Sequence, residues 1–422
     1  MESKKEVHCR EAVVSDVLIF FLINYIVHAV TALKSPGSSI AATADAALVA
    51  LLVPYKGIFF AVRVISLQAF FCRDPLQRAH RARALCCVVR TTVLEGKPAH
   101  TFDGGTEKIF LIWRVKTNVS CAEWQPGPIQ SLKDVHAKIH GLINLPQGYD
   151  LAIVPKFVRV EPLDDTEHKP GTYTSNIICC NYNIVKVFAA IVQTVAGCIS
   201  LYHARDHQLL RLGYTAYSLT VIPYMLMSLT NLVASLSCPE YPTLYIVDSE
   251  LLQAATYEGA TVHGTVGRVN SFVRRPRTLF ERFFKRFLYL ISAGLVVFPF
   301  LAIGLLTKFQ PGPDTTVEEK AWILSWLITS ILFGVPLGYT MKDTYTHSLS
   351  TLWRQFKSFR QIKAHAVDGW IGKIVYASIL GFFIAIFIFL RLVTWFIIFL
   401  TPIGMFVTVA RQVLKYGVCK WV

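Results

Sequence analysis

The run VVSDVLIFFLINYIVHAVTAL, residues 13–33, decides the class of fold. It has no charged residue after Asp16, and it ends at the helix-breaking sequence KSPG of residues 34–37. A helix needs about 20 apolar residues to cross the hydrocarbon core of a bilayer. The residues before the run mix acidic and basic side chains, and the run is longer than the apolar part of a signal peptide. We therefore predict a retained membrane anchor.

Similar apolar runs recur along the 422 residues, which are 53% hydrophobic and only 16% charged, with a mean hydropathy of +0.46. Because soluble domains carry about 25% charged residues, we predict an α-helical polytopic membrane protein with eight spans, or alternatively seven. The second run contains Pro54 and forms either one kinked span or a short span followed by an interfacial helix. The last run is too long for one span, so we divide it into two. The runs after the anchor are residues 40–71, 184–202, 212–236, 287–306, 321–340 and 371–409.

The net charge of +15 orients these spans. If eight spans alternate, 32 of the 42 Lys and Arg residues fall on one side and six on the other, while four lie inside apolar segments. Cytosolic loops are the ones that carry excess Lys and Arg, so we expect the amino terminus and every large loop in the cytosol, at a plasma membrane or an endomembrane. The predicted regions are the anchor and kinked segment at 1–71, a cytosolic α+β region at 72–183, a transmembrane hairpin at 184–236, a basic cytosolic loop with an amphipathic helix at 237–286, a second hairpin at 287–341, a basic amphipathic helix at 342–370, and a C-terminal transmembrane region with a short tail at 371–422.

The α+β prediction for residues 72–183 rests on β-branched and aromatic runs at Ile109–Val115 and Leu151–Val160, which Gly, Pro and Asp residues bound. The orientation places nearly all of the ten cysteines in the cytosol, where thiols stay reduced. Several of them flank spans, as S-palmitoylated cysteines commonly do. Plain buried or surface thiols are the alternative. The thiols that flank spans are Cys72, Cys179, Cys180, Cys238 and Cys419.

Two basic segments have the apolar period of an amphipathic helix, one around residues 280–287 and one around residues 349–356. A basic face beside an aromatic face is typical of a helix in the interface of an anionic leaflet. Packing on the protein's own cytosolic domain is the alternative, and no nucleic-acid-binding motif accompanies the charge. We therefore predict the anionic cytosolic leaflet as the partner. The candidate lipid contacts are Arg274, Arg275, Arg277, Arg282, Lys285, Arg286, Arg354, Lys357 and Arg360.

Polar residues within the apolar runs are candidates for a ligand site. Asn24 and His28 are four residues apart in the middle of the first run, and polar groups at that depth normally face the bundle interior or a cavity. They either clamp two helices together, which we favour because interhelical hydrogen bonds are common, or bind a ligand. Lys56, beside Pro54 and Gly57, either marks the cytosolic edge of a short span, which we favour, or lies at a broken helix of the kind that lines transporter sites.

Two pairs of histidines have the spacing His-x-x-x-His, namely His136 with His140 and His203 with His207. On a helix this spacing places both imidazoles on one face, where they can chelate a metal. The predicted topology puts the two pairs on opposite sides of the membrane, so surface histidines are the favoured interpretation. We expect no cofactor.

Three segments together resemble a group of multi-pass membrane proteins of filamentous fungi that has no known activity. They are residues 24–29 (NYIVHA) with Pro36-Gly37, residues 140–151 with their LPQGYDL sequence, and residues 264–267 (GTVG). The resemblance implies a membrane location and a fungal source, and it supplies no catalytic residue.

Two functions fit these observations. The first is a membrane protein that binds or organises a lipophilic ligand, a lipid or a partner protein. The alternative is an integral-membrane enzyme that acts on a hydrophobic substrate, with Asn24, His28 and the pair His136 and His140 as acid–base or metal groups. The sequence contains no known catalytic motif that favours the enzyme.

Overall fold

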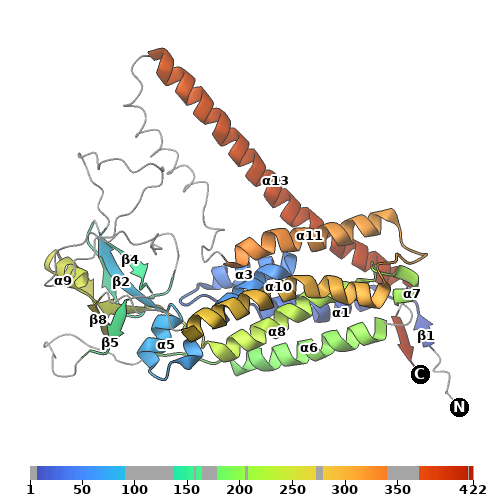
Figure 1. Cartoon of the computed structure of the whole chain (residues 1–422), viewed down its shortest axis with the longest axis horizontal. Coiled ribbons are helices and arrows are strands. Elements are labelled where there is room, and N and C mark those ends of the chain that lie inside the picture. Colours follow the sequence, from blue (N-terminus) through green and yellow to red (C-terminus); the bar gives the residue numbers. More distant parts are fainter. Residues whose placement is uncertain are drawn as a thin grey trace.

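The computed structural model describes residues 7–90, 137–147, 149–155, 158–163, 178–204, 208–271, 279–339, 370–416 and 418–421. It is mostly helical, with a small sheet at one end of an elongated helical bundle (Figure 1). Four helices are long and apolar enough to cross a membrane, and a bent helix pair makes a fifth if it counts as one span. The seven or eight predicted spans exceed this number. The four are Ile184–Ala204, Tyr217–Ser237, Arg282–Thr307 and Leu392–Tyr416.

The first apolar run forms one helical rod, which changes its winding halfway. Helix α1, Val14–Phe21, continues into a π-helical turn, η1, Leu22–Ile26, and then into α2, Val27–Val30. Together they form an apolar helix over Val14–Val30, at the lower limit of the length that crosses a bilayer. The π turn buries Asn24 and Tyr25 in the bundle.

The second apolar run is broken at Pro54. Helix α3, Ile40–Leu52, ends at Val53, and α4, Pro54–Ser66, leaves at an angle of 120°. Proline cannot continue a helix, and it disfavours helical backbone at the residue before it; Val53 accordingly has φ −133° and ψ 76°. The predicted kinked span would carry the chain across the bundle. Instead, both ends of the pair lie toward the sheet.

Contacts on both sides of the broken pair establish this return. Before α3, the Gly37 amide donates to Tyr241 O, and the Lys138 amide donates to Gly37 O. After α4, the short helix η2, Ala69–Phe71, brings the ring of Phe71 within 5.6 Å of the ring of Phe280. The break itself lies within the bundle, where Val53 packs in a buried cluster with Ile398.

Two further sets of consecutive helices run in opposite directions along the bundle (Figure 1). Helix α6, Ile184–Ala204, leads through α7, Gln208–Leu212, and η3, Tyr217–Val221, to α8, Ile222–Ser237. Helix α10, Leu279–Thr307, is followed by α11, Val317–Tyr339. The two turns meet at Gly213, which has φ +58° and packs so closely on Gln310 that a Cβ at this position would overlap Gln310 O. Only glycine fits this contact.

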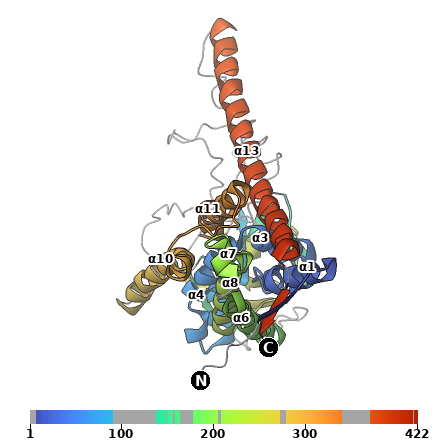
Figure 2. The same ribbon diagram turned by 90° about the vertical axis from the view of Figure 1, so that its right-hand side faces the viewer.

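The last apolar run corrects the sequence prediction. Residues expected to form two spans form a single helix, α13, Trp370–Tyr416, of 47 residues. The sequence TPIG at 401–404 does not interrupt it, and Pro402 lies inside the helix. Figure 2 shows α13 extending well beyond the bundle, whose middle is occupied by α8.

The sheet draws on two separate parts of the chain. Its strand order is β4-β2-β6-β8-β5, with β2 antiparallel to β4 and parallel to β6. Two of these strands come from residues 237–286, a segment predicted to be a loop, so the sheet extends beyond residues 72–183. The strands are β2, Leu85–Arg90; β4, Tyr149–Ile153; β5, Arg159–Glu161; β6, Tyr245–Asp248; and β8, Thr265–Ser271.

Both faces of the sheet are covered. Cys87 and Val89 of β2 pack in one buried cluster with Leu76 of α5, Pro75–Arg81. Cys86 and Val88 pack in another with Leu252 and Ala255 of α9, Glu250–Tyr257. Burial raises the pKa of the Cys86 thiol to about 12 and that of Cys87 well above its usual value. These two cysteines are therefore part of the core. A smaller ladder pairs β3, Ile143–Asn144, with β7, Thr261–Val262.

The two ends of the described chain meet far from this sheet. Strand β1, Val7–Arg10, pairs antiparallel with β9, Val418–Trp421, so that Cys9 lies opposite Cys419. Figure 1 shows this pair at the end of the bundle opposite the sheet. The sequence prediction placed the amino terminus and the large loops on one side of the membrane, whereas the structure separates β1 from the sheet by the length of the bundle.

Candidate functional site

A cluster of polar side chains is buried in the bundle where α1–η1–α2 packs against α6 and α8. Asn24 and His28 project from the rod that contains the π turn and are 3% and 0% exposed. Asn24 Nδ2 donates to Phe20 O at 3.0 Å, and Asn24 Oδ1 accepts from Ser200 Oγ of α6 at 3.1 Å. π turns within α-helices often mark functional positions. The structure therefore brings together the two polar residues singled out from the sequence.

His28 is joined to two helices by a chain of hydrogen bonds. Its Nδ1 lies 2.6 Å from Ser228 Oγ of α8, and Ser228 Oγ donates to Gln193 Oε1 of α6 at 3.1 Å. Gln193 Nε2 then donates to Val27 O at 2.9 Å, which returns the chain to the rod. All three side chains are buried.

These hydrogen bonds determine which ring nitrogen of His28 carries the proton. Val27 O is a carbonyl and only accepts, so the amide NH₂ of Gln193 must face it, and Oε1 must face Ser228. Ser228 gives its one hydroxyl proton to Oε1 and must accept from His28 Nδ1. In neutral His28 the other nitrogen, Nε2, is consequently an unprotonated acceptor. It is buried and has no hydrogen-bond partner among the described residues.

A second acceptor follows one helical turn further along the same interface. Thr31 Oγ1 donates to His28 O at 2.7 Å and accepts from Asn231 Nδ2 of α8 at 3.4 Å. Asn231 is 1% exposed, and its Oδ1 has no partner within the described part of the chain. A buried polar atom without a partner costs about 1–3 kcal/mol. His28 and Asn231 thus each present a buried acceptor without a partner among the described residues.

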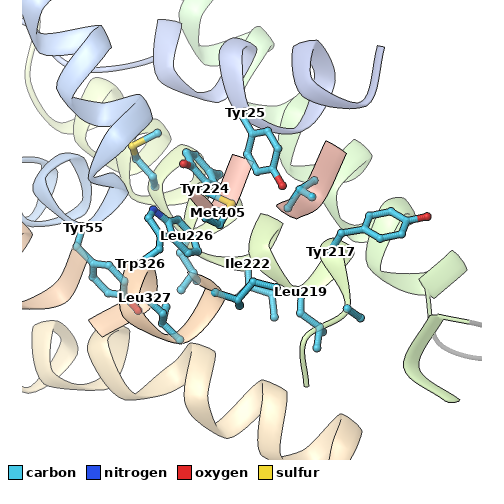
Figure 3. Close-up of a cluster of buried hydrophobic side chains, with 14 of the residues drawn as sticks. Tyr25, Tyr55, Tyr217, Leu219, Ile222, Tyr224, Leu226, Trp326, Leu327 and Met405 are labelled. Atoms are coloured by element: carbon cyan, nitrogen blue, oxygen red, sulfur yellow. The ribbon is translucent and has the colours of Figure 1, made fainter. Parts of the chain in front are cut away.

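Aromatic side chains connect this cluster to the broken helix pair (Figure 3). The ring of Tyr25 lies 4.9 Å from that of Tyr224, which stacks at 5.9 Å on Trp326 of α11. The Tyr224 hydroxyl donates to Leu51 O at 2.5 Å, and Trp326 Nε1 donates to Leu52 O at 3.3 Å. These donors satisfy carbonyls that the end of α3 leaves without helical partners.

Lys56 lies in the first turn of α4, directly after the break. It is half-buried, and its neighbour Tyr55 is fully buried. Helix α11 packs closely on this turn, since a Cβ at Gly334 would lie 2.8 Å from the Lys56 backbone nitrogen. The structure thus places Lys56 at a helix break that packs against α11. Its position relative to a membrane edge stays a prediction from the sequence.

The candidate lipid contacts are described only in part. The predicted amphipathic helix around residues 280–287 forms the first turns of α10, which continues without a break into the span. Arg282 and Arg286 are exposed there, beside the exposed rings of Phe283 and Phe287. The other candidates lie outside the described residues, or in the case of Lys285 only the backbone is described. They are Arg274, Arg275, Arg277, Arg354, Lys357 and Arg360.

The histidine pairs are likewise only half described, since His136 and His207 lie outside the described residues. His140 sits beside the sheet, with its ring 5.1 Å from that of Tyr245. The described residues contain no group of three or more His, Cys, Asp or Glu side chains arranged to hold a metal ion.

Sequence reasoning missed the partners of His28 on the neighbouring helices. Ser228 and Asn231 are three residues apart in the apolar helix α8, and Gln193 lies in the middle of α6. Polar residues at helical spacing in a span were the available signal. Only the packing of the helices shows which of them meet.

Comparison with known proteins adds no further assignment. No protein family model, curated protein or solved structure matches the chain. The likeness to the fungal membrane proteins stays a prediction from the sequence.

Proposed function

We propose that the chain is a multi-pass membrane protein that binds the polar group of a lipophilic molecule at the cluster around His28. The observation that carries this proposal is the pair of buried, unused acceptors, His28 Nε2 and Asn231 Oδ1. A hydroxyl or amino group on a lipid or lipid-like metabolite supplies the matching donor. Binding sites for such molecules commonly lie between the helices of a bundle.

The surroundings of the cluster support a lipophilic ligand. Helix α6, which contributes Gln193 and Ser200, presents exposed apolar side chains on its outer face, among them Val185, Phe188 and Val192. Lipid is the solvent that suits this surface. A lipophilic molecule therefore reaches the α2–α6–α8 interface from the bilayer, and its polar group pairs with the acceptors inside.

The proposal is tested by identifying what the protein retains. We expect organic extraction of the detergent-purified protein to release a hydroxylated or amino lipophilic compound, detected by mass spectrometry. His28→Leu removes the acceptor at similar volume and should lose the compound. Ser330→Ala, which removes another buried hydroxyl from α11, is the matched control and should retain it. Equal amounts in all three proteins, or none in the wild type, would contradict the proposal.

The arrangement of the helices also supports a revised topology. In this proposal α1–η1–α2, α6, α8, α10, α11 and α13 cross the membrane, while α3 and α4 enter from the sheet side and return to it. The sheet end is cytosolic because it carries more cations, among them Arg73, Arg78, Arg81 and Lys138. Strands β1 and β9 then lie on the opposite side.

Cysteine labelling in sealed microsomes distinguishes this topology from the one predicted from the sequence. Tyr257→Cys, on exposed α9, should react with an impermeant maleimide added outside, since the cytosolic face of microsomes points outward. Glu11→Cys, next to β1, should react only after detergent opens the vesicles. Peptide mass spectrometry locates the label. Reaction of both positions without detergent would refute the proposed separation.

The exposed residues at the start of α10 support contact with an anionic cytosolic leaflet. Arg282 and Arg286 lie beside Phe283 and Phe287, whose rings stack with centroids 6.4 Å apart. Aromatic rings and basic side chains together favour the interface of a membrane that carries anionic lipids. In this proposal the start of α10 lies at the cytosolic surface, next to the sheet.

A further inference from the structure

A group of thiols lies where the sheet joins the helical bundle. Cys179 and Cys180 lie within five residues before the start of α6 at Ile184, and Cys238 immediately follows α8. Asn181 and Glu240 connect these two segments through paired backbone hydrogen bonds of 3.0 and 2.9 Å. Three cysteines thus lie on two adjacent segments of the chain, at the end of the α6–α8 helix pair that faces the sheet.

The backbone that carries Cys179 and Cys180 is held in place. The Cys179 amide donates to the Tyr245 hydroxyl at 2.9 Å, and that hydroxyl donates back to Cys179 O at 3.0 Å. Lys186 of α6 pairs with Glu240 at 2.7 Å and holds the start of the helix against the same segment. Both cysteines nevertheless have exposed side chains. They are therefore fixed in position and accessible.

The position of these thiols corresponds to the surface of the membrane. The exposed apolar face of α6 begins at Ile184 and Val185, which are 77% and 78% exposed, and Tyr182 lies exposed between the thiols and that face. Tyrosine is enriched at the level of the lipid headgroups. Cys180 is thus close to the interface and within reach of acyl chains in the outer part of the hydrocarbon core.

We propose that Cys179 and Cys180 are S-acylated with long-chain fatty acids. The sulfur attacks the carbonyl carbon of a long-chain acyl-coenzyme A, a new sulfur–carbon bond forms, and the bond to coenzyme A breaks. Coenzyme A leaves as its thiol with the proton from the cysteine. The attached chain lies along the exposed apolar face of α6 and holds the sheet against the bilayer. Juxtamembrane cysteines are the usual sites of this modification.

Two other cysteines differ from Cys179 and Cys180 in burial or in position. Cys238 is half-buried, and burial together with nearby Cys180 raises its pKa to about 12, which leaves little of the reactive thiolate. Cys198 is exposed but lies within α6, away from the aqueous phase that supplies acyl-coenzyme A. Neither is expected to be acylated.

The test uses the full chain expressed in cells that are fed an alkynyl fatty acid. We expect the wild-type protein to take up the label and to release it in neutral hydroxylamine, which cleaves thioesters. The double variant Cys179→Ser/Cys180→Ser should lose most of the label, while Cys198→Ser and Cys238→Ser should retain it. Elution of each variant at the wild-type position in size-exclusion chromatography shows that the fold is preserved.

Three results would overturn the proposal: label that persists in the double variant, absence of label from the wild type, or free thiols at both positions in the protein isolated from membranes. The inference relies on the cytosolic position of the sheet and not on the ligand cluster. His28→Leu should therefore be labelled like the wild type. Failure of ligand retention and failure of acylation are thus separate outcomes.

Discussion

Gly334→Ala is expected to destabilise the helical bundle by about 2–3 kcal/mol, because the added methyl group has no space. Its Cβ would lie 2.6 Å from Tyr55 Cβ and 2.8 Å from the Lys56 backbone nitrogen. These atoms belong to the helix at the break, so they move only if α4 and α11 separate. Thermal unfolding in detergent, followed by tryptophan fluorescence, should show a lower midpoint.

Gly294→Ala is the matched control for this substitution. Gly294 also lies in a long apolar helix, α10, but its Cβ would meet no heavy atom within 4 Å. Alanine is favoured over glycine in a helix interior by about 1 kcal/mol, so the midpoint should stay constant or rise. If both variants lose the same stability, the close contact between α4 and α11 does not exist in solution.

Tyr224→Phe is expected to destabilise the protein by about 1–2 kcal/mol, because the partly buried carbonyl of Leu51 loses the donor that α8 supplies. The Tyr224 hydroxyl bonds to Leu51 O at 2.5 Å, in the last turn before the break. Phenylalanine keeps the ring contacts with Tyr25 and Trp326. The same thermal unfolding experiment measures the loss.

Tyr55→Phe separates the effect of this hydrogen bond from that of losing any buried hydroxyl. The Tyr55 hydroxyl reaches Val296 O at 3.5 Å, a long contact to a carbonyl in the interior of α10. Its removal should change stability by less than half of the Tyr224→Phe effect. An equal loss in both variants would show that Tyr224 does not have a special role at the end of α3.

Local composition predicted several parts of this architecture. The apolar runs at 184–202 and 287–306 lie within α6 and α10, since about 20 consecutive apolar residues in lipid have few alternatives to a helix. The strands β4 and β5 overlap the two ends of the predicted β-branched run Leu151–Val160 and extend one or two residues beyond it. The strand prediction at Ile109–Val115 lies outside the described residues.

Features that depend on contacts between distant segments could not be predicted in this way. Pro54 indicates a break, but it indicates neither the 120° angle nor the donors that Tyr224 and Trp326 supply from other helices to the end of α3. Pro402 carries the same local signal and does not end α13. Two prolines in apolar runs thus differ in outcome because of what surrounds them.

The candidate site was likewise predictable only in part from the local sequence. Asn24 and His28 stood out because polar groups in the middle of an apolar run are costly. The sequence left open whether they clamp helices or bind a ligand, because the answer depends on the hydrogen bonds of His28, Ser228 and Gln193. The hydrogen bonds show that Nδ1 of His28 joins two helices, while Nε2 has no partner among the described residues. The use of Nε2 by a ligand is our proposal.

The division of the sheet between two parts of the chain has a consequence for biosynthesis. Strand β2 leaves the ribosome before α6 and α8, whereas its partner β6 follows them. The strand is apolar on both faces, and until β6 arrives one of its edges is unpaired, a state that favours aggregation. Completion of the sheet therefore has to wait until the intervening helices α6 and α8 have been synthesised.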